Sequence, residues 1–392
     1  MAVTQLPVFR DYETLPHLLV DTRIREITSR IIDVPTTRAH KLSNTEIQHQ
    51  SYVHVSVLFE NGIVGHGEAA TLGGPRWSEE SVEAIHSNIR AYLGPALINL
   101  PGCRVEVTNL VMAKTAKRNF AAKSAVNAAI LDALGKTLDV HVATLLGGAV
   151  RTRFPAIWAL ASGDAGQEAE EAKAKIAQGQ FNRFKIKLGF ADPKTDLARL
   201  ARLRRELPAD TLLIADINQG WSEADCRRLL PALEDLAIAL VEQPIDAEAI
   251  ETLARVADRT RIPIMLDEAV FTATEAHRAV TLGAGQVLSL KLCKHGSAQE
   301  LMRIAGIAAA GGLELYGGCL LESSLGAAAH LASFAALPRL EWGCEHFGPL
   351  ILTEDTTTQS LVYDDYHVLL PDGPGLGVAP DPDRIARFER SL

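Results

Sequence analysis

Charged residues end a series of apolar segments at regular intervals in the second half of the sequence. Lys187, Asp216, Glu242, Asp267 and Lys291 follow such segments, at successive spacings of 29, 26, 25 and 24 residues. Each spacing matches the length of one strand–helix unit of a (β/α) barrel. The five side chains are therefore expected at the same level on successive parallel strands, at the barrel mouth where active sites lie.

Three of these residues are carboxylates, and together they indicate a metal site. Asp216, Glu242 and Asp267 would repel one another at one mouth unless a cation neutralised them. Ligand sets made only of oxygen favour Mg²⁺ or Mn²⁺ over Zn²⁺, so one such ion is expected. Glu268 is an alternative to Asp267, because neighbouring residues of a strand point to opposite sides. Asn218 is expected just outside the ligands.

Lysines beside a divalent ion indicate proton transfer next to a substrate carboxylate. The ion takes up the negative charge that develops when the adjacent carbon gains or loses a proton. Lys185 and Lys187 are two residues apart on one strand, so both are expected to face inward. We expect Lys187, Lys291 and the ion to lower the pKa of one another's ionising groups. Lys294 competes with Lys291, but Lys291 directly follows the strand and keeps the spacing.

Each of these residues also has an ordinary structural interpretation. A single aspartate at a strand end is more often a helix cap or an ion-pair partner. A Lys-x-Lys pair usually lies on a solvated strand face, but chance rarely brings five such residues into register. His40, His295 and His346 are candidates for substrate contacts, and an interpretation as packing histidines is equally good. Trp158 is expected in the core near the barrel mouth.

The segments around these residues predict an α/β fold. From about residue 154, near-continuous apolar runs alternate with helical runs rich in alanine, leucine and charged residues. This alternation is typical of a parallel sheet covered by helices, and seven or eight such units fit a closed barrel. An open doubly wound sheet is the alternative, but it normally carries a glycine-rich phosphate-binding sequence after its first strand, which this chain lacks.

The first third of the chain predicts a smaller α+β module. Alternating patterns indicate strands at residues 23–34, 51–59 and 63–70, with a hairpin turn at Asn61-Gly62. Helical patterns follow at residues 79–93, where Gly94-Pro95 is expected to stop the helix, and at residues 121–138.

The expected division of the chain has four parts. They are an N-terminal extension (1–22), an α+β capping domain (23–149), a barrel (150–350) and a C-terminal segment (351–392) that completes the end of the barrel and the capping domain. The tail at residues 363–392 contains one more alternating stretch, at residues 366–370, and a loop rich in proline and glycine, and this tail is expected to fold back onto the N-terminal module. The extension suggests no purpose beyond a subunit contact.

The composition argues against several classes of function. The formal net charge of −9 disfavours nucleic-acid binding, because phosphate backbones require a basic surface. No segment approaches the roughly 18 apolar residues that would span a bilayer. The five cysteines are widely spaced, which indicates free thiols in a reducing compartment. A cytoplasmic protein is therefore expected, without nucleic-acid or membrane partners.

The order of the short motifs resembles the muconate-lactonising branch of the enolase superfamily. The motifs are KIK at 185–187, DIN at 216–218, EQP at 242–244, DE at 267–268 and LKLCK at 290–294. Longer segments are similar to bacterial muconate and chloromuconate cycloisomerases and are far more specific, among them DINQGW, YGGCLLESSLG and GCEHFGPLILTED. The resemblance extends from about residue 23 to the C-terminus.

The resemblance implies an α+β capping domain on a modified (β/α)₇β barrel that carries the catalytic groups. By position, it implies one Mn²⁺ or Mg²⁺ ion per subunit, held by Asp216, Glu242 and Asp267. The catalytic residues implied are Lys187, Lys291, Lys185 and Glu345. The residues implied to contact substrate are Leu72, Trp77, Asn218, Lys294, Phe347 and His40. Relatives of this kind are homo-oligomers, often octamers.

The reaction implied by the resemblance is cycloisomerisation of cis,cis-muconate, or of a chloro- or methyl-substituted muconate, to a muconolactone in aromatic-compound catabolism. Lys187 would deliver the proton in a syn addition and Lys291 in an anti addition, and sequence position leaves both open. The residue types at Trp77 and Ser289 are similar to those of chloromuconate enzymes, whereas the residue type at Lys294 is similar to that of muconate enzymes. Of the two substrate classes, we expect unsubstituted muconate slightly more than a substituted muconate.

Other functions remain as alternatives. Dipeptide epimerases, N-acylamino acid racemases and o-succinylbenzoate synthases of the same superfamily use the same two lysines. A dipeptide epimerase is expected to show an Asp-x-Asp ammonium site near the last strand, where this chain has Glu322 and Glu345 but no such pair. A metal-binding scaffold without catalysis would not require inward lysines, which are costly to bury without a task.

Overall fold

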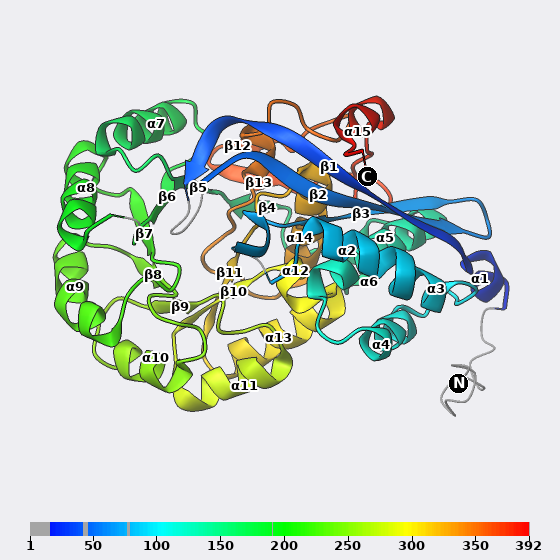
Figure 1. The fold of residues 1–392 in the computed structure, drawn as a ribbon, viewed down its shortest axis with the longest axis horizontal. Coiled ribbons are helices and arrows are strands. Elements are labelled where there is room, and N and C mark those ends of the chain that lie inside the picture. Colours follow the sequence, from blue (N-terminus) through cyan, green and yellow to red (C-terminus); the bar gives the residue numbers. More distant parts are fainter. Residues whose placement is uncertain (1–15, 42–45, 77–78, 190, 392) are drawn as a thin grey trace.

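The computed structural model describes residues 16–41, 46–76, 79–189 and 191–391. Figure 1 shows a curled array of strands and helices beside a smaller layered part with long antiparallel strands. Trp77 lies outside the described residues, as do most of the expected N-terminal extension and the loop that follows Lys41. Among the helices of the described ranges, none is long and apolar enough to cross a membrane.

The capping part is built on a three-stranded antiparallel sheet. β1 (Ile24–Lys41) pairs with β2 (Glu46–Phe59), and β2 pairs with β3 (Val64–Ala70). Gly62 has a φ of +83° in the turn between β2 and β3, which glycine adopts without steric cost, and the predicted hairpin is confirmed. β1 runs past its predicted end, because the guanidinium of Arg38 donates to the Ala159 carbonyl of the barrel at 2.9 Å.

One predicted helix is broken into three pieces. α2 (Val82–Asn88) is capped by Ser81, and it continues into the π-helical turn η4 (Ile89–Leu93) and then into α3 (Gly94–Leu97). The predicted stop at Gly94-Pro95 is wrong. Pro95 lies in the first turn of α3, where the missing N–H of proline costs no hydrogen bond.

The long helix α5 (Phe120–Leu138) lies between the two parts, and most of its residues are buried. Its backbone packs directly on β3, since a Cβ atom placed on Gly67 would lie 2.1 Å from the Ala125 carbonyl oxygen. On its other side, the Asn127 side chain accepts the backbone N–H of Ala298 at 3.0 Å. One helix therefore holds the capping sheet against the barrel. Three shorter helices complete this part: α1 (Pro16–Asp21), α4 (Val105–Thr115) and α6 (Val142–Leu145).

The second part is a parallel sheet of seven strands in the order β5 to β11. The strands are β5 (Ile157–Leu160), β6 (Arg183–Lys187), β7 (Leu212–Asp216), β8 (Leu240–Glu242), β9 (Ile264–Leu266), β10 (Val287–Leu290) and β11 (Glu314–Gly317). Cys344 closes the sheet with parallel bridges to Ala156, next to β5, and to Gly317 of β11. The predicted barrel is confirmed, and a single bridging residue stands where an eighth strand would lie.

Helices cover the outside of this sheet, as the outer ring of Figure 1 shows. They are α7 (Ala165–Ala177), α8 (Pro193–Glu206), α9 (Glu223–Asp235), α10 (Ile250–Ala257), α11 (Ala273–Leu282), α13 (Ala298–Ala310) and α14 (Ser324–Ala336), with the short α12 (Leu292–His295) after β10. Most begin at a side chain that accepts a backbone N–H of the first turn, which satisfies donors that a helix start leaves unpaired. These caps are Asp164, Asp192, Ser222, Thr272, Ser297 and Ser323.

The C-terminal segment contacts both parts. β12 (Tyr363–Asp364) and β13 (His367–Leu369) form a hairpin that pairs with β4 (Arg153–Pro155), just before the first barrel strand. The alternating stretch therefore joins the barrel, whereas the rest of the tail contacts the N-terminal module, as expected. α15 (Pro382–Phe388) packs against β1, where Glu389 bridges Ile32.

Candidate active site

The five regularly spaced residues lie together at the carboxyl ends of neighbouring strands. Lys187, Asp216 and Glu242 are the last residues of β6, β7 and β8. Lys187 is in register with Asp216, and Asp216 with Glu242. Asp267 and Lys291 directly follow β9 and β10. All five side chains are buried at one level of the barrel, because parallel neighbours in register present their ends at the same edge.

Ion pairs connect these residues across the mouth. The Nζ atom of Lys187 lies 2.6 Å from Oδ2 of Asp216, and Nζ of Lys291 lies 2.6 Å from Oδ2 of Asp267. Lys187 and Lys291 thus lie beside different carboxylates of the group. In the chain alone, each lysine neutralises an aspartate that was predicted to bind the metal ion.

The predicted lowering of the lysine pKa values does not hold for the chain alone. Burial is the largest single influence on the pKa of Lys187 and lowers it, but the carboxylates of Asp216, Glu242 and Glu345 together outweigh burial and raise the pKa above its ordinary value. At Lys291 burial is likewise outweighed by several carboxylates together, led by Asp267, and the pKa lies well above its ordinary value. The prediction counted the neighbouring cations and not the carboxylates that pair with them.

The chemistry of the group fits a divalent cation. Both carboxylate oxygens of Glu242 are buried, Oε1 has no hydrogen-bond partner within the described chain, and Oε2 has an ion-pair contact with the Lys185 ammonium at 2.5 Å. Burial and the Asp216 carboxylate hold the pKa of Glu242 well above its usual range. The raised pKa means that the environment of Glu242 disfavours its charged form. A divalent cation bound beside Glu242 would stabilise that charged form. Asp216, Glu242 and Asp267 supply only oxygen atoms, the donor set of Mg²⁺ and Mn²⁺.

Lys185 lies deeper in the barrel and joins two carboxylates. Its Nζ atom is 2.5 Å from Oε2 of Glu242 and 2.5 Å from Oε2 of Glu345. The Tyr316 hydroxyl donates to Oε2 of Glu345 at 3.1 Å, and the Cys319 N–H donates to Oε1 at 3.0 Å. Sequence reasoning missed Tyr316, because a tyrosine within an apolar strand reads as ordinary core.

Lys294 holds Asp267 in place. Its Nζ atom donates to the Asp267 carbonyl at 2.7 Å, to Oδ1 of Asp267 at 2.8 Å and to the Ser289 carbonyl at 2.8 Å. An ammonium group has three N–H donors, and these three acceptors satisfy them. Lys294 therefore orients a predicted metal ligand, which its place in the sequence did not indicate.

Asn218 and Glu268 form a polar link beside the aspartates. Lys187 donates to Oδ1 of Asn218 at 3.1 Å, and Nδ2 of Asn218 donates to Oε1 of Glu268 at 3.3 Å. Burial and the neighbouring Asp267 carboxylate raise the pKa of Glu268 to about 7. Asn218 lies just outside the carboxylates, as we expected from its position two residues after Asp216.

Aromatic side chains line the side of the barrel next to β1. The rings of Trp158 and Phe347 are 4.8 Å apart, and His40 lies 6.5 Å from Phe347. All three are buried, and Nδ1 of His40 has no hydrogen-bond partner in the described chain. Leu72, on the loop after β3, is also buried. The three of these residues that were predicted to contact substrate, His40, Leu72 and Phe347, therefore come from both parts of the molecule.

The other two histidines lie farther round the barrel. His295 contacts the Phe271 carbonyl through Nδ1 at 2.9 Å. His346 packs against His330, with ring centroids 4.6 Å apart. Neither contact distinguishes a substrate role from ordinary packing.

A cavity of about 590 Å³ lies between the barrel and the capping part. Asp267, Lys291 and Lys294 border it from the barrel, and Thr71 and Phe120 from the capping part. The two parts therefore enclose space next to Lys291, one of the lysines predicted to be catalytic. A small carboxylic acid is of a size that such a cavity accommodates.

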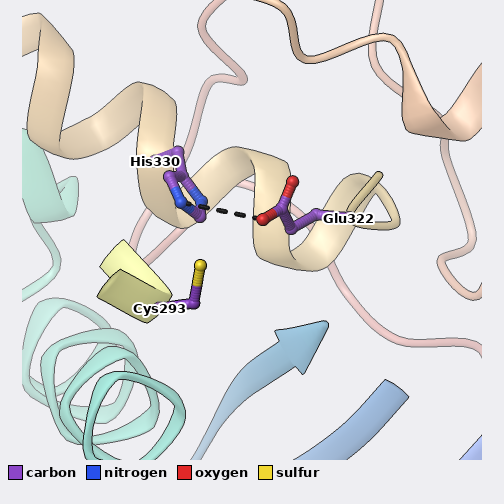
Figure 2. Close-up of side chains that lie close together, drawn as sticks. All are labelled: Cys293, Glu322 and His330. Carbon is purple, nitrogen blue, oxygen red and sulfur yellow. Dashed lines mark ion pairs between the residues drawn. The ribbon is translucent and has the colours of Figure 1, made fainter. Parts of the chain in front are cut away.

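One further group of potential metal ligands lies nearby and was not predicted. Cys293, Glu322 and His330 are buried, and one donor atom from each lies within 4.8 Å of the others (Figure 2). This group contains sulfur and nitrogen, unlike the three carboxylates at the mouth. Cys293 follows Lys291 by two residues and carried no recognisable ligand spacing.

Comparisons with known proteins match both parts of the chain. Residues 26–147 match the mandelate racemase / muconate lactonizing enzyme N-terminal domain, and residues 167–384 match the enolase C-terminal domain-like family. The chain belongs to the mandelate racemase/muconate lactonizing enzyme family. The enolase-like fold predicted from the sequence is thereby confirmed, and enzymes of this superfamily depend on a divalent metal ion.

Individual members of this family are similar over nearly their full length. "Muconate cycloisomerase 1" of Pseudomonas putida is 39% identical, over 91% of this chain and 96% of the relative. The chloromuconate cycloisomerase of Cupriavidus pinatubonensis is 37% identical, over 94% and 99%. A muconate lactonizing enzyme of Pseudomonas fluorescens, solved with muconolactone, superimposes with a TM-score of 0.93 at 36% identity, covering 94% of this chain and all of that chain.

Proposed function

We propose that this family member is a cycloisomerase that converts cis,cis-muconate, or a chloro- or methyl-substituted muconate, to a muconolactone in the catabolism of aromatic compounds. The observation that carries the proposal is the pair of buried lysines, Lys187 and Lys291, that flank three carboxylates at the barrel mouth. Full-length similarity to muconate and chloromuconate cycloisomerases supports the choice of substrate.

The proposed reaction forms one C–O bond and moves one proton to carbon. One substrate carboxylate attacks its own diene conjugately, and electrons shift towards the other carboxylate. A divalent ion held by Asp216, Glu242 and Asp267 would bind that second carboxylate and stabilise its growing negative charge. The ammonium of Lys187 or Lys291 then delivers a proton to the α-carbon, and a proton from solvent restores the lysine. The dianionic substrate therefore takes up one proton overall and gives a lactone monoanion, and the two compounds are isomers as free acids.

The electrostatics of the chain support lysines as acids. Both lysines have pKa values above the ordinary range in the chain alone, so both hold a proton before substrate binds. A bound cation would remove their carboxylate partners and add positive charge nearby, which lowers both pKa values and favours proton delivery.

The surrounding residues receive supporting roles in this proposal. Lys185 and Glu345 tune the charge behind the substrate, and Lys294 and Asn218 orient groups next to it. The proposed substrate contacts also include His40, Leu72, Phe347 and Trp77, the last outside the described residues.

Four finer points belong to the same proposal. The cofactor is one Mn²⁺ or Mg²⁺ ion per subunit, because the three ligands offer oxygen alone. The substrate is a small dicarboxylate, and the assembly is a homo-oligomer of up to eight subunits, as the sequence resemblance suggests. The five cysteines are free thiols, which supports a cytoplasmic location.

The decisive experiment follows muconate absorbance with purified protein and Mn²⁺, on cis,cis-muconate, its 2- and 3-substituted forms and a panel of dipeptides. We expect turnover of muconates, and a fall in kcat of about 10³-fold or more in Lys187→Ala or Lys291→Ala, the scale of losing a general acid. Lys117→Ala is the matched control, because Lys117 is exposed on the capping part.

Two results would contradict the proposal. Turnover of dipeptides alone would favour an epimerase, and muconate turnover that survives both lysine substitutions would remove the proposed acids. Reaction in D₂O followed by assignment of product configuration distinguishes syn addition from anti addition. Because a substrate bound with its other face towards Lys187 would let Lys187 serve both, the two lysine variants decide which lysine delivers the proton.

A further inference from the structure

Three buried side chains outside the proposed catalytic centre converge on one point. Cys293 belongs to α12, Glu322 precedes α14 and His330 lies within α14, and Figure 2 shows their polar ends facing one another. One donor atom from each lies within 4.8 Å of the other two. Three different elements thus bring a thiol, a carboxylate and an imidazole together.

The hydrogen bonds of His330 leave Nε2 as the acceptor atom of the ring. Nδ1 lies 2.9 Å from the Gly326 carbonyl, so Nδ1 carries the proton and donates it. Nε2 accepts the Leu292 N–H at 2.9 Å and lies 3.8 Å from Oε1 of Glu322. Metal-binding histidines typically have the same arrangement, with the distal N–H donated to a backbone carbonyl.

Glu322 is a buried carboxylate with few partners. It accepts the Leu320 N–H at 3.0 Å, and no lysine or arginine of the described chain lies within ion-pair distance of it. Among the described residues, the basic side chains within that distance are two histidines, His330 and His346, which carry a charge only when protonated. A carboxylate removed from water requires a compensating charge, and this one has none that is permanent.

His346 provides an independent indication of a missing partner. Its Nε2 atom lies 3.9 Å from Oε2 of Glu322, and its ring stacks near that of His330. Both ring nitrogens of His346 are buried without a hydrogen-bond partner among the described residues. A buried imidazole normally has a hydrogen-bond partner for at least one ring nitrogen. His346 therefore lacks a polar partner at the same point at which the Glu322 carboxylate lacks a permanent counter-charge.

We propose that Cys293, Glu322 and His330 form a second metal site, with His346 as the fourth ligand, that takes a thiophilic divalent ion such as Zn²⁺. Sulfur and nitrogen donors favour Zn²⁺ over Mg²⁺ or Mn²⁺, which separates this site from the three carboxylates at the mouth. A nitrogen and an oxygen ligand of a tetrahedral zinc lie about 3.3 to 3.4 Å apart, so the 3.8 Å between Nε2 of His330 and Oε1 of Glu322 is only about half an ångström wider than a bound pair.

Binding requires two local changes. The Cys293 thiol loses its proton to solvent as the metal–sulfur bond forms, since coordinated thiols are deprotonated. Nε2 of His330 exchanges the Leu292 N–H for the ion, which leaves one buried N–H unpaired. The cost of that loss is small beside the free energy with which zinc binds structural sites.

An ion bound at this second site would affect the position of Lys291 in the proposed catalytic centre. Cys293 borders the cavity between the two parts, so an ion can arrive from there. Leu292, whose N–H would be displaced, directly follows Lys291. We therefore expect Zn²⁺ to slow muconate turnover by shifting Lys291, a consequence that rests on the proposed function, whereas the binding itself does not.

Cadmium binding to the full-length protein tests the site without substrate. With the carboxylate site saturated with Mg²⁺, one equivalent of Cd²⁺ should produce the ultraviolet charge-transfer band of a cadmium–thiolate bond, and Zn²⁺ should remove it. Cys293→Ser should abolish the band, and His346→Phe should weaken cadmium binding by about tenfold or more. Cys226→Ser is the matched control, a buried cysteine of α9.

The outcomes are distinguishable. A wild-type protein without the band, or a Cys293→Ser variant that keeps it, overturns the proposal. Should Cys293→Ser fail to fold, anomalous scattering from wild-type crystals soaked in Zn²⁺ decides: a peak bonded to the Cys293 sulfur supports the site, and its absence overturns it. Muconate activity does not enter either measurement, so failure of the proposed function leaves this test intact.

Discussion

The ionisable groups at the barrel mouth are equal in number and opposite in sign, so their charges balance once Glu242 has lost its proton. Four buried lysines lie among four buried carboxylates: Lys185, Lys187, Lys291 and Lys294, with Asp216, Glu242, Asp267 and Glu345. A dianion that entered this group alone would leave it with excess negative charge in a medium of low dielectric constant. A divalent cation restores the balance, so the site fits a dicarboxylate and a doubly charged ion together, and neither alone.

Replacement of one carboxylate tests this balance at the residue scale. Glu242→Gln removes a group that holds a proton when no ion is present, so we expect the metal-free variant to melt close to the wild-type temperature. Mn²⁺ at 100 times its Kd should stabilise the wild type by about 2.7 kcal/mol and the variant hardly at all. Thermal melts with and without Mn²⁺ measure both effects.

Glu248→Gln is the control for that comparison, because Glu248 borders the same cavity but is exposed. It should keep the full stabilisation by Mn²⁺. A Glu242→Gln variant that also keeps it would show that Glu242 does not bind the ion.

The sequence identified the mouth residues because strand ends repeat at the length of one βα unit. It could not show which partners each side chain would find. Lys294 meets three acceptors around Asp267, and Tyr316 reaches Glu345, only because β9, β10 and β11 lie side by side. The rise of the lysine pKa values in the chain without an ion was not predicted for the same reason, since it depends on contacts between residues more than 20 positions apart.

At the scale of elements, the contact between β3 and α5 leaves no room for side chains. A Cβ on Gly67 would lie 2.1 Å from the Ala125 carbonyl oxygen, an atom of the helix backbone that cannot turn away. We expect Gly67→Ala to destabilise the protein by about 3 kcal/mol or more through overpacking. Urea unfolding followed by circular dichroism measures the change.

A second glycine serves as the matched control. Gly306 lies in α13, and a Cβ placed there meets nothing within 4 Å. Gly306→Ala should stabilise the protein by about 0.5–1 kcal/mol, because alanine restricts the unfolded chain and favours the helix. Equal effects of the two substitutions would rule out the close approach of β3 and α5.

Local patterns predicted the elements whose cause is local. The Asn61-Gly62 turn and the helix over α5 were predicted from a few adjacent residues. Elements with distant causes were not. β1 extends to Lys41 because Arg38 reaches the barrel, Pro95 continues a helix because it falls in a first turn, and Cys344 closes the sheet because β5 and β11 lie on either side of it.

At the scale of the whole molecule, a buried carboxyl group joins the capping part to the barrel. Glu68 of β3 accepts the backbone N–H of Ser323, the cap of α14, at 2.9 Å, and it also contacts the Ser323 hydroxyl. Burial raises the pKa of Glu68 to about 8, and the nearby carboxylates of Glu322 and Asp355 add to the rise. The junction between the parts is therefore sensitive to pH.

The sign of that sensitivity follows from the two pKa values. The ordinary pKa of 4.5 applies to Glu68 in the unfolded chain, and about 8 applies in the folded protein. Between these values the folded state binds more protons, so the stabilisation is complete below pH 4.5 and is lost as pH rises through 8. The wild type should lose on the order of 4 kcal/mol relative to Glu68→Gln across this range. Denaturant unfolding of both proteins at pH 5, 7 and 9 measures the difference in stability. Glu60→Gln is the control, because Glu60 is exposed. A difference that does not change with pH would show that Glu68 is ionised in the folded protein throughout.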